Sequence, residues 1–283
     1  MKSFFHYAAL ITCTILIWYT LSQVIINHST SEIYQTAIQS DVILIGDSHA
    51  ENIPWGESNS AFILPGSGLL HTYLVLKTLA ANKNLTQKPT KIVATIWPGT
   101  FSTHQEGRYT GDFNDKWGSA IGGRISSIFS LHDYLSQDIP LYVKKQSFYG
   151  ILQMNRSTTH RIGNNCSAEI TQQSKLSVDQ SIYPANWMEK AETSWWFFNQ
   201  CNQIAESNKF QLIWVTTPTH PNFLNVCGDI STYFQAFPEN AFVSHLNVLN
   251  VDSNKSGFID YHHINCILAQ PLRDTIMAFV SER

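Results

Sequence analysis

A serine flanked by an acid and an imidazole follows the first apolar run after the amino-terminal segment. The stretch DVILIGDSHA places Asp47, Ser48 and His49 directly after residues suited to a buried strand. A serine hydroxyl is a weak nucleophile until a base removes its proton, and 11 histidines compete for that role. Ser48 is therefore our candidate nucleophile, and the question is which histidine can reach it.

The strongest candidate for the base lies in GFIDYHHIN, near the carboxyl end of the chain. Asp260 and His263 are three positions apart, so in a tight turn the carboxylate can orient the imidazole. We expect His263 to accept the Ser48 proton and return it to the leaving group, while Asp260 stabilises the imidazolium. His262 is the alternative base.

Short apolar runs that end in Gly or Pro predict the elements that must position these residues. Four of them are DVILIG at 41–46, AFILPG at 61–66, KIVATIWPG at 91–99 and FQLIWVTTP at 210–218, and HLNVLNVD at 245–252 is a fifth candidate. Strands that are apolar on both faces suit a parallel sheet covered by helices. Helical patterns begin near Gly68, Asn186 and Cys266. This alternation predicts an α/β sandwich, with Ser48 at the carboxyl end of the first strand, where such sheets bind ligands.

The amino-terminal segment predicts a membrane anchor. Phe4 to Ile26 contains no Asp, Glu, Lys or Arg, and such a helix is long enough to cross the ~30 Å of hydrocarbon in a bilayer. Lys2 precedes the span, which favours a cytoplasmic amino terminus and an extracytoplasmic domain, in a bacterium the periplasm. We therefore expect an anchor at 1–26, a polar linker at 27–40 and a globular domain at 41–283.

The alternation of strand and helix patterns is interrupted at about 102–184, where Gly, Ser, Asn and aromatic residues are frequent, and we interpret this segment as an insertion. Connections of this length usually build a lid or a binding surface.

The net charge of −3 provides no basic field for nucleic acid, so we expect no such partner.

Four cysteines follow the anchor, and an even number in an exported domain permits two disulfides. We predict the pairs Cys166–Cys201 and Cys227–Cys266, with buried thiols as the alternative. None of the four forms a C-x-x-C pair, so we expect no zinc site.

IGDSHA and DYHHIN resemble the first and last sequence blocks of the SGNH (GDSL-like) hydrolase superfamily. Members carry a Gly-Asp-Ser block after the first strand and an Asp-x-x-His block before the final helix. The resemblance covers about residues 40–283 without the insertion. It implies a flavodoxin-like three-layer sandwich, serine acyl transfer without a metal or other cofactor, and ester substrates.

The other two blocks of the superfamily supply oxyanion-hole donors, and here the resemblance is incomplete. LPGSGLL at 64–70 resembles the second block, so the backbone N–H of Gly68, or alternatively Gly66, would join that of Ser48 as a donor. The third block brings an asparagine, whereas this chain has IWPGTFS. Thr100, Ser102 or a donor from the insertion would have to substitute.

The anchor and the missing asparagine resemble the membrane-anchored branch of the superfamily, which includes D-alanyl-transfer and alginate-acetylation proteins. This implies an esterase or O-acyltransferase acting on an O-acylated glycan of the cell envelope. The alternative is a catalytically weak glycan-binding or assembly module that partners a multi-span membrane O-acyltransferase.

Several further residues are candidates for substrate contact. They are His49, Trp97, Thr100 and His220, together with Tyr109 and Trp117 as further aromatic platforms for sugars.

Overall fold

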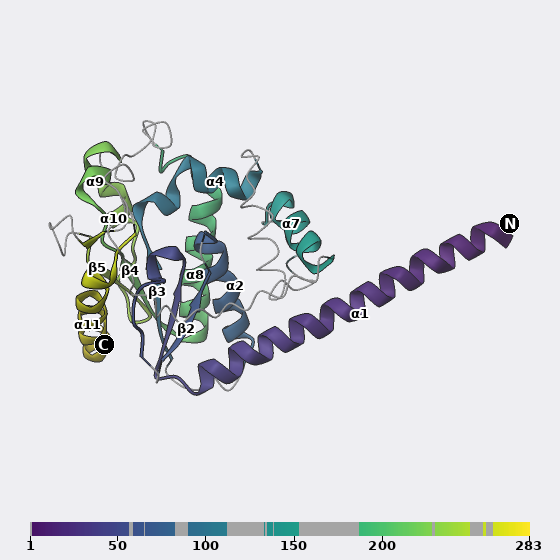
Figure 1. The fold of residues 1–283 in the computed structure, drawn as a ribbon, viewed down its shortest axis with the longest axis horizontal. Helices are drawn as coiled ribbons and strands as arrows, with labels where there is room; N and C mark the ends of the chain where they lie inside the picture. Colours follow the sequence, from purple (N-terminus) through teal and green to yellow (C-terminus); the bar gives the residue numbers. More distant parts are fainter. Residues whose placement is uncertain are drawn as a thin grey trace.

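A five-stranded sheet forms the centre of the domain (Figure 1). Its strands are β1 (Val42–Gly46), β2 (Ser60–Ile63), β3 (Lys91–Ile96), β4 (Gln211–Thr216) and β5 (Val243–Asn247). They run in the order β2-β1-β3-β4-β5, and every neighbouring pair is parallel. This order is that of flavodoxin-like sheets. Four of the predicted strands and the parallel arrangement are confirmed with small shifts at the strand ends. The fifth strand begins earlier than predicted and overlaps the run 245–252 only at residues 245–247.

The computed structural model describes residues 2–56, 59–64, 66–82, 90–111, 133, 135–137, 139–152, 187–227, 230–249, 257–258 and 263–283.

Two apolar clusters bury the two faces of the sheet. Ile43 and Ile45 of β1 belong to one cluster, with side chains of α2 (Gly68–Ala80) and α8 (Glu192–Asn208). Leu44 belongs to the other cluster, with side chains of α11 (Cys266–Glu282). The continuous apolar pattern of β1 therefore reflects burial on both faces.

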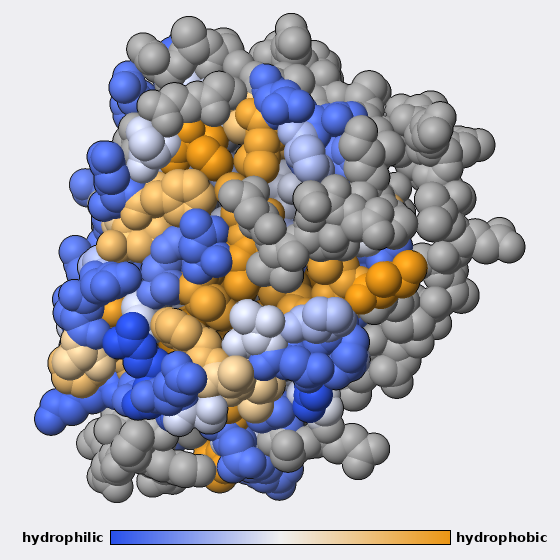
Figure 2. Space-filling model, turned by 90° about the vertical axis from the view of Figure 1, so that its left-hand side faces the viewer, coloured by the Kyte–Doolittle hydropathy of each residue, from blue (hydrophilic) through white to orange (hydrophobic). Residues whose placement is uncertain are grey.

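Helices thus cover the sheet on both sides and give three layers (Figure 1). On the side of the molecule that carries α11, hydrophilic side chains are interspersed with apolar ones (Figure 2). Such a mixed surface is ordinary for a helix layer that faces solvent.

The chain begins with one long helix, α1 (Lys2–Ile38), whose amino-terminal part extends away from the domain (Figure 1). Phe5 and Leu10 are each 66% exposed, whereas Ile33 and Ala37 are only 2% exposed and join the core beside α2. The predicted linker at 27–40 is therefore helical as far as Ile38. The sequence predicts that Phe4–Ile26 crosses a membrane. In the described part of the chain, none of the helices is long and apolar enough to do so.

The described part of the predicted insertion contains α4 (Thr103–Thr110) and α7 (Leu141–Leu152). The carboxylate of Glu106 accepts the backbone N–H groups of Thr193 and Ser194, at 2.8 and 3.1 Å. A carboxylate at a helix amino terminus satisfies donors that lack partners within the helix and complements the helix dipole. Through Glu106, α4 thus caps α8 and is fixed against the domain. Residues 112–132 and 153–184 lie outside the described part of the chain.

Two short helices, α9 (Pro221–Cys227) and α10 (Ser231–Gln235), connect β4 to β5. The connection begins at the carboxyl end of β4, on the same edge of the sheet as the end of β1, because the strands are parallel.

The cysteines correct one prediction. Cys201 is a buried free thiol on α8, so the predicted Cys166–Cys201 disulfide is wrong, and burial raises the pKa of the Cys201 thiol. Cys227 is also a thiol, and its Sγ donates to the carbonyl of Leu224 at 3.7 Å. The predicted Cys227–Cys266 disulfide is therefore wrong as well. Cys166 and the side chain of Cys266 lie outside the described part of the chain.

The end of β1 packs too closely for any side chain at Gly46. A Cβ there would lie 2.5 Å from Cβ of Ala50 and 2.5 Å from Oγ1 of Thr95. We expect Gly46→Ala to lower the free energy of unfolding by about 1–3 kcal/mol, the usual cost of overpacking, in urea denaturation.

The variant Thr95→Ala is the matched control, because it removes one of the two close contacts. The double variant should lose less stability than the sum of the two single variants. Strictly additive losses would show that this contact is not the cause.

Candidate active site

Ser48 lies in a short 3₁₀ turn, η1 (Ser48–Ala50), directly after β1. β1 lies between β2 and β3. The chain passes from β1 to β2 on one side and then crosses to β3 on the other side, so the carboxyl end of β1 is the switch point of the sheet. Ligands of open parallel sheets bind in the crevice at such a point. The close packing of Gly46 fixes the turn that presents the Ser48 hydroxyl there.

His263 lies beside Ser48 although the two residues are 215 positions apart. Its Nε2 lies 2.8 Å from Oγ of Ser48, within ordinary hydrogen-bonding distance. The contact predicted from the sequence is therefore present. Neutral imidazole can accept the hydroxyl proton at Nε2, which is the geometry that general-base activation of a serine requires.

Hydrogen bonds on both sides of His263 hold its backbone in place. Asn52, just after η1, donates from its side-chain amide to the carbonyl of Ile264 at 2.8 Å. Asn265 accepts the N–H of Ile267 at 3.0 Å and thereby caps α11. Its own N–H donates to the carbonyl of Gly257 at 2.9 Å. The segment that carries His263 is thus tied to the turn that carries Ser48 and to the start of the last helix.

Two of the residues predicted for this site lie outside the described part of the chain. They are Asp260, the predicted acid of the triad, and His262, the alternative base.

His49 is not a surface residue but is buried and bonded to Asp47. Oδ1 of Asp47 lies 2.7 Å from Nδ1 of His49 and also accepts the backbone N–H of His49 at 3.0 Å. Burial raises the pKa of Asp47, but the charge and hydrogen bonds of His49, with a contribution from His263, outweigh it and lower that pKa to about 2. Asp47 is therefore a buried carboxylate that stays ionised at neutral pH.

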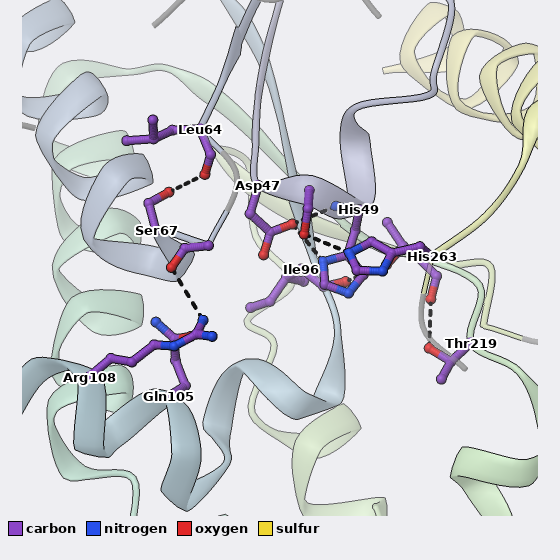
Figure 3. Close-up of polar contacts among 12 residues, drawn as sticks. Asp47, His49, Leu64, Ser67, Ile96, Gln105, Arg108, Thr219 and His263 are labelled. Carbon is purple, nitrogen blue, oxygen red and sulfur yellow. Dashed lines mark hydrogen bonds and ion pairs between the residues drawn. The ribbon is translucent and has the colours of Figure 1, made fainter. Parts of the chain in front are cut away.

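The His49 ring also contacts the ring of His263. The ring centroids of His49 and His263 are 5.0 Å apart, and the planes are inclined by 21°, which is a stacked arrangement. Figure 3 shows the two rings side by side, with the Asp47 carboxylate directed at His49. Trp97, a predicted substrate contact, lies against His49 at 4.6 Å between centroids. The ring of Trp97 also covers Gly99, where a Cβ would come within 2.1 Å of it.

Gly68, the predicted second oxyanion donor, is the first residue of α2 and has a φ of 54°, in the left-handed region. A Cβ at Gly68 would lie 2.7 Å from Nε2 of Gln105 and 2.7 Å from the hydroxyl of Tyr109. The close approach of α4 therefore requires a glycine. The carbonyl of Gly66, the alternative, accepts from Nη1 of Arg108 at 3.5 Å.

The structure gives different roles to the residues considered as substitutes for the missing asparagine. Oγ of Ser102 accepts the N–H of Gln105 at 3.2 Å and caps α4. Thr100 is buried, and its N–H donates to the carbonyl of Trp97 at 3.0 Å. Gln105 was missed by the sequence reasoning. Its side chain is buried next to Gly68, where its amide lies beside the Tyr109 hydroxyl, and its Oε1 accepts from Nη1 of Arg108 at 3.3 Å.

Two predicted substrate contacts are core residues instead. Tyr109 is 3% exposed, and its hydroxyl donates to the carbonyl of Ser67 at 3.3 Å, so the predicted sugar platform at this residue is wrong. His220 is fully buried, and its Nδ1 accepts the N–H of Asn222 at 3.1 Å. This bond stabilises the turn that begins α9. Trp117 lies outside the described residues.

A third histidine, His71, lies in this region and was not singled out from the sequence. It is fully buried on α2, and neither ring nitrogen has a hydrogen-bond partner among the described residues. Burial lowers the pKa of His71 to about 4, although the nearby Asp47 carboxylate acts in the opposite direction. The only signal in the sequence is a histidine within the apolar pattern of α2.

His71 should make the protein sensitive to mild acid. Its pKa of about 4 lies below the ordinary value of 6.5, so the unfolded chain binds an extra proton between these values and stability falls as pH falls through this window. We expect about 3 kcal/mol of stability to be lost between pH 6.5 and 4 through this group, and His71→Leu to remove that part of the pH dependence. Urea denaturation at a series of pH values measures it. An unchanged pH dependence in the variant would contradict the assignment.

Among the described residues, no cluster of three His, Cys, Asp or Glu side chains could hold a metal ion. In comparisons with known proteins, no family model and no curated protein matches the chain. The resemblance to SGNH hydrolases therefore rests on the motifs themselves.

Proposed function

We propose that the protein is a serine esterase or O-acyltransferase of the SGNH type. The observation that carries the proposal is the 2.8 Å contact between Nε2 of His263 and Oγ of Ser48, at the switch point of a parallel sheet. The contact joins a hydroxyl and an imidazole from opposite ends of the chain. It lies at the edge of the sheet where such folds bind ligands, so the two groups are suited to act as a nucleophile and its base.

The mechanism follows from these two groups. His263 accepts the proton of Ser48 as Oγ attacks an ester carbonyl, and a tetrahedral intermediate forms. His263 then gives the proton to the leaving alcohol, which leaves an acyl group on Ser48. Water or a sugar hydroxyl resolves this acyl-enzyme, with His263 as the base again. Asp260 is the proposed acid behind His263.

The oxyanion of the tetrahedral intermediate needs donors that are already in position. The backbone N–H groups of Ser48 and Gly68 are the proposed pair. Gln105 is the proposed third donor, in place of the missing asparagine. Its buried amide nitrogen lies beside Gly68, and the amide has the same chemistry as that of asparagine.

The substrate class and location extend the proposal beyond the site. An O-acylated glycan of the cell envelope is the proposed substrate, and the globular domain is proposed to be extracytoplasmic and anchored through Phe4–Ile26. The exposed apolar side chains of α1, such as Phe5, Leu10 and Ile17, support contact between this helix and an apolar environment.

The test of the nucleophile is Ser48→Ala. We expect it to abolish turnover of a small acetyl ester and labelling by a fluorophosphonate probe, because both reactions need Oγ. Ser48 is half-buried and loses one hydrogen bond, so the free energy of unfolding should fall by only about 0.5–1.5 kcal/mol. The second variant, His263→Gln, should lose turnover as well while Ser48 remains present.

Turnover that survives in Ser48→Ala would refute the proposal. A folded wild-type protein that neither turns over the ester nor reacts with the probe would favour the alternative of a glycan-binding or assembly module.

Gln105→Leu tests the third oxyanion donor. We expect kcat to fall by about 10²–10³-fold, the usual effect of losing one such donor, with KM little changed because the interaction forms in the transition state. Ser102→Ala is the matched control. It removes the cap of α4, with an expected cost of about 1 kcal/mol in stability, but leaves the amide of Gln105 in place. Equal loss of kcat in both variants would attribute the effect to α4 and not to the amide.

A further inference from the structure

We propose that His49, fixed by Asp47, is a positioning residue that holds the imidazole of His263 in the orientation needed to take the Ser48 proton. The inference rests on the proposed function, because it assigns a role within the same site.

The first step is that His49 itself has little freedom. It is 4% exposed, and Asp47 holds it by two bonds to one carboxylate oxygen, at 3.0 Å from the backbone N–H and 2.7 Å from the ring Nδ1. Asp47 is also the cap residue of η1. The carboxylate therefore fixes the turn and the rotamer of the imidazole at the same time.

The second step is that this fixed ring limits the movement of His263. The two rings stack at 5.0 Å between centroids with an angle of 21°. The hydrogen bond between Oγ of Ser48 and Nε2 of His263 restrains one point of the ring but allows its plane to turn. A stacked neighbour restrains the plane, so the bond and the stack together define the position of the base.

The third step concerns charge. The imidazolium of His263 forms when it takes the Ser48 proton, and the pKa of Asp47 is lowered partly by His263, so the two groups interact electrostatically. His49 transfers no proton in this scheme and does not touch the substrate.

Three variants of His49 separate the ring from its hydrogen bond. His49→Ala loses both, His49→Phe keeps a ring that can stack, and His49→Asn keeps a side-chain donor for Asp47. We expect kcat for a small acetyl ester to fall by about 100-fold in His49→Ala with KM unchanged, the size of effect produced by misplacing a catalytic group. His49→Phe should recover a large part of this loss, and His49→Asn should recover little.

His245→Phe is the matched control. His245 is also a partly buried histidine stacked on an aromatic ring, at 3.8 Å from Phe237, but it bonds to Thr216 and does not contact Ser48 or His263 in any described interaction. We expect this variant to keep wild-type kcat and KM.

The His49 inference would be overturned by unchanged kcat in His49→Ala, by equal recovery in His49→Phe and His49→Asn, or by a rise in KM alone, which would indicate a substrate contact. Histidine ring signals in the NMR spectrum of the whole protein give a readout that does not need turnover. The His263 signals should shift or broaden in His49→Ala and be restored in His49→Phe. If the wild type has no esterase activity, the proposed function fails and the NMR signals alone decide whether His49 positions His263.

Discussion

The hydrogen bond between Ser48 and His263 depends on two segments from opposite ends of the chain being held at the same edge of the sheet. β1 supplies one of them, because its residues are buried on both faces and cannot shift without exposing apolar surface. The other segment is fixed by Asn52, which bonds to the residue after His263, and by the cap of α11. Loss of either restraint would let Nε2 of His263 and Oγ of Ser48, now 2.8 Å apart, move out of hydrogen-bonding distance.

The site tolerates a buried charge because a neighbour stabilises it. Desolvation alone would raise the pKa of Asp47, yet this pKa is lowered to about 2, so the interactions with His49 and His263 exceed the cost of burial. A shift of this size corresponds to about 2 kcal/mol in favour of the ionised form. Removing His49 would remove most of the interactions that offset the desolvation of the Asp47 carboxylate. The buried charge of Asp47 therefore depends on His49. The neighbouring His71 stays neutral, because burial lowers its pKa to about 4 despite the opposing effect of the Asp47 carboxylate.

The sequence predicted the parts of the fold that follow from simple patterns. Continuous apolar runs ended by Gly or Pro located four of the five strands. Parallel strands place their carboxyl ends at one edge, so the sequence was sufficient to predict the position of Ser48 at that edge. The contact with His263 was predicted from the spacing of Asp260 and His263 and from the resemblance of the two motifs to the superfamily blocks. The spacing of Asp47 and His49 was visible, but whether a histidine two residues from an acid turns toward it depends on the 3₁₀ turn, which the sequence does not specify.

The failed predictions concern residues whose environment is set by distant parts of the chain. Tyr109 looked like an exposed aromatic platform, but α4 packs against the start of α2 and buries it. Cys201 is a buried free thiol in the apolar cluster between α8 and the sheet, so an even number of cysteines did not indicate a disulfide at this position. The polar composition of 27–40 suggested a linker, whereas its spaced apolar residues Ile33 and Ala37 allow a helix to dock on the core.

The same packing that buries Tyr109 explains how an oxyanion hole could be built without the missing asparagine. Glu106 ties α4 to the amino terminus of α8, and α4 then lies close enough to Gly68 that no side chain fits between them. This places an amide from Gln105 beside the proposed backbone donor, from a different element than the superfamily uses. The requirement is for a fixed dipole near the oxyanion and not for a particular residue, so a helix from an insertion can meet it.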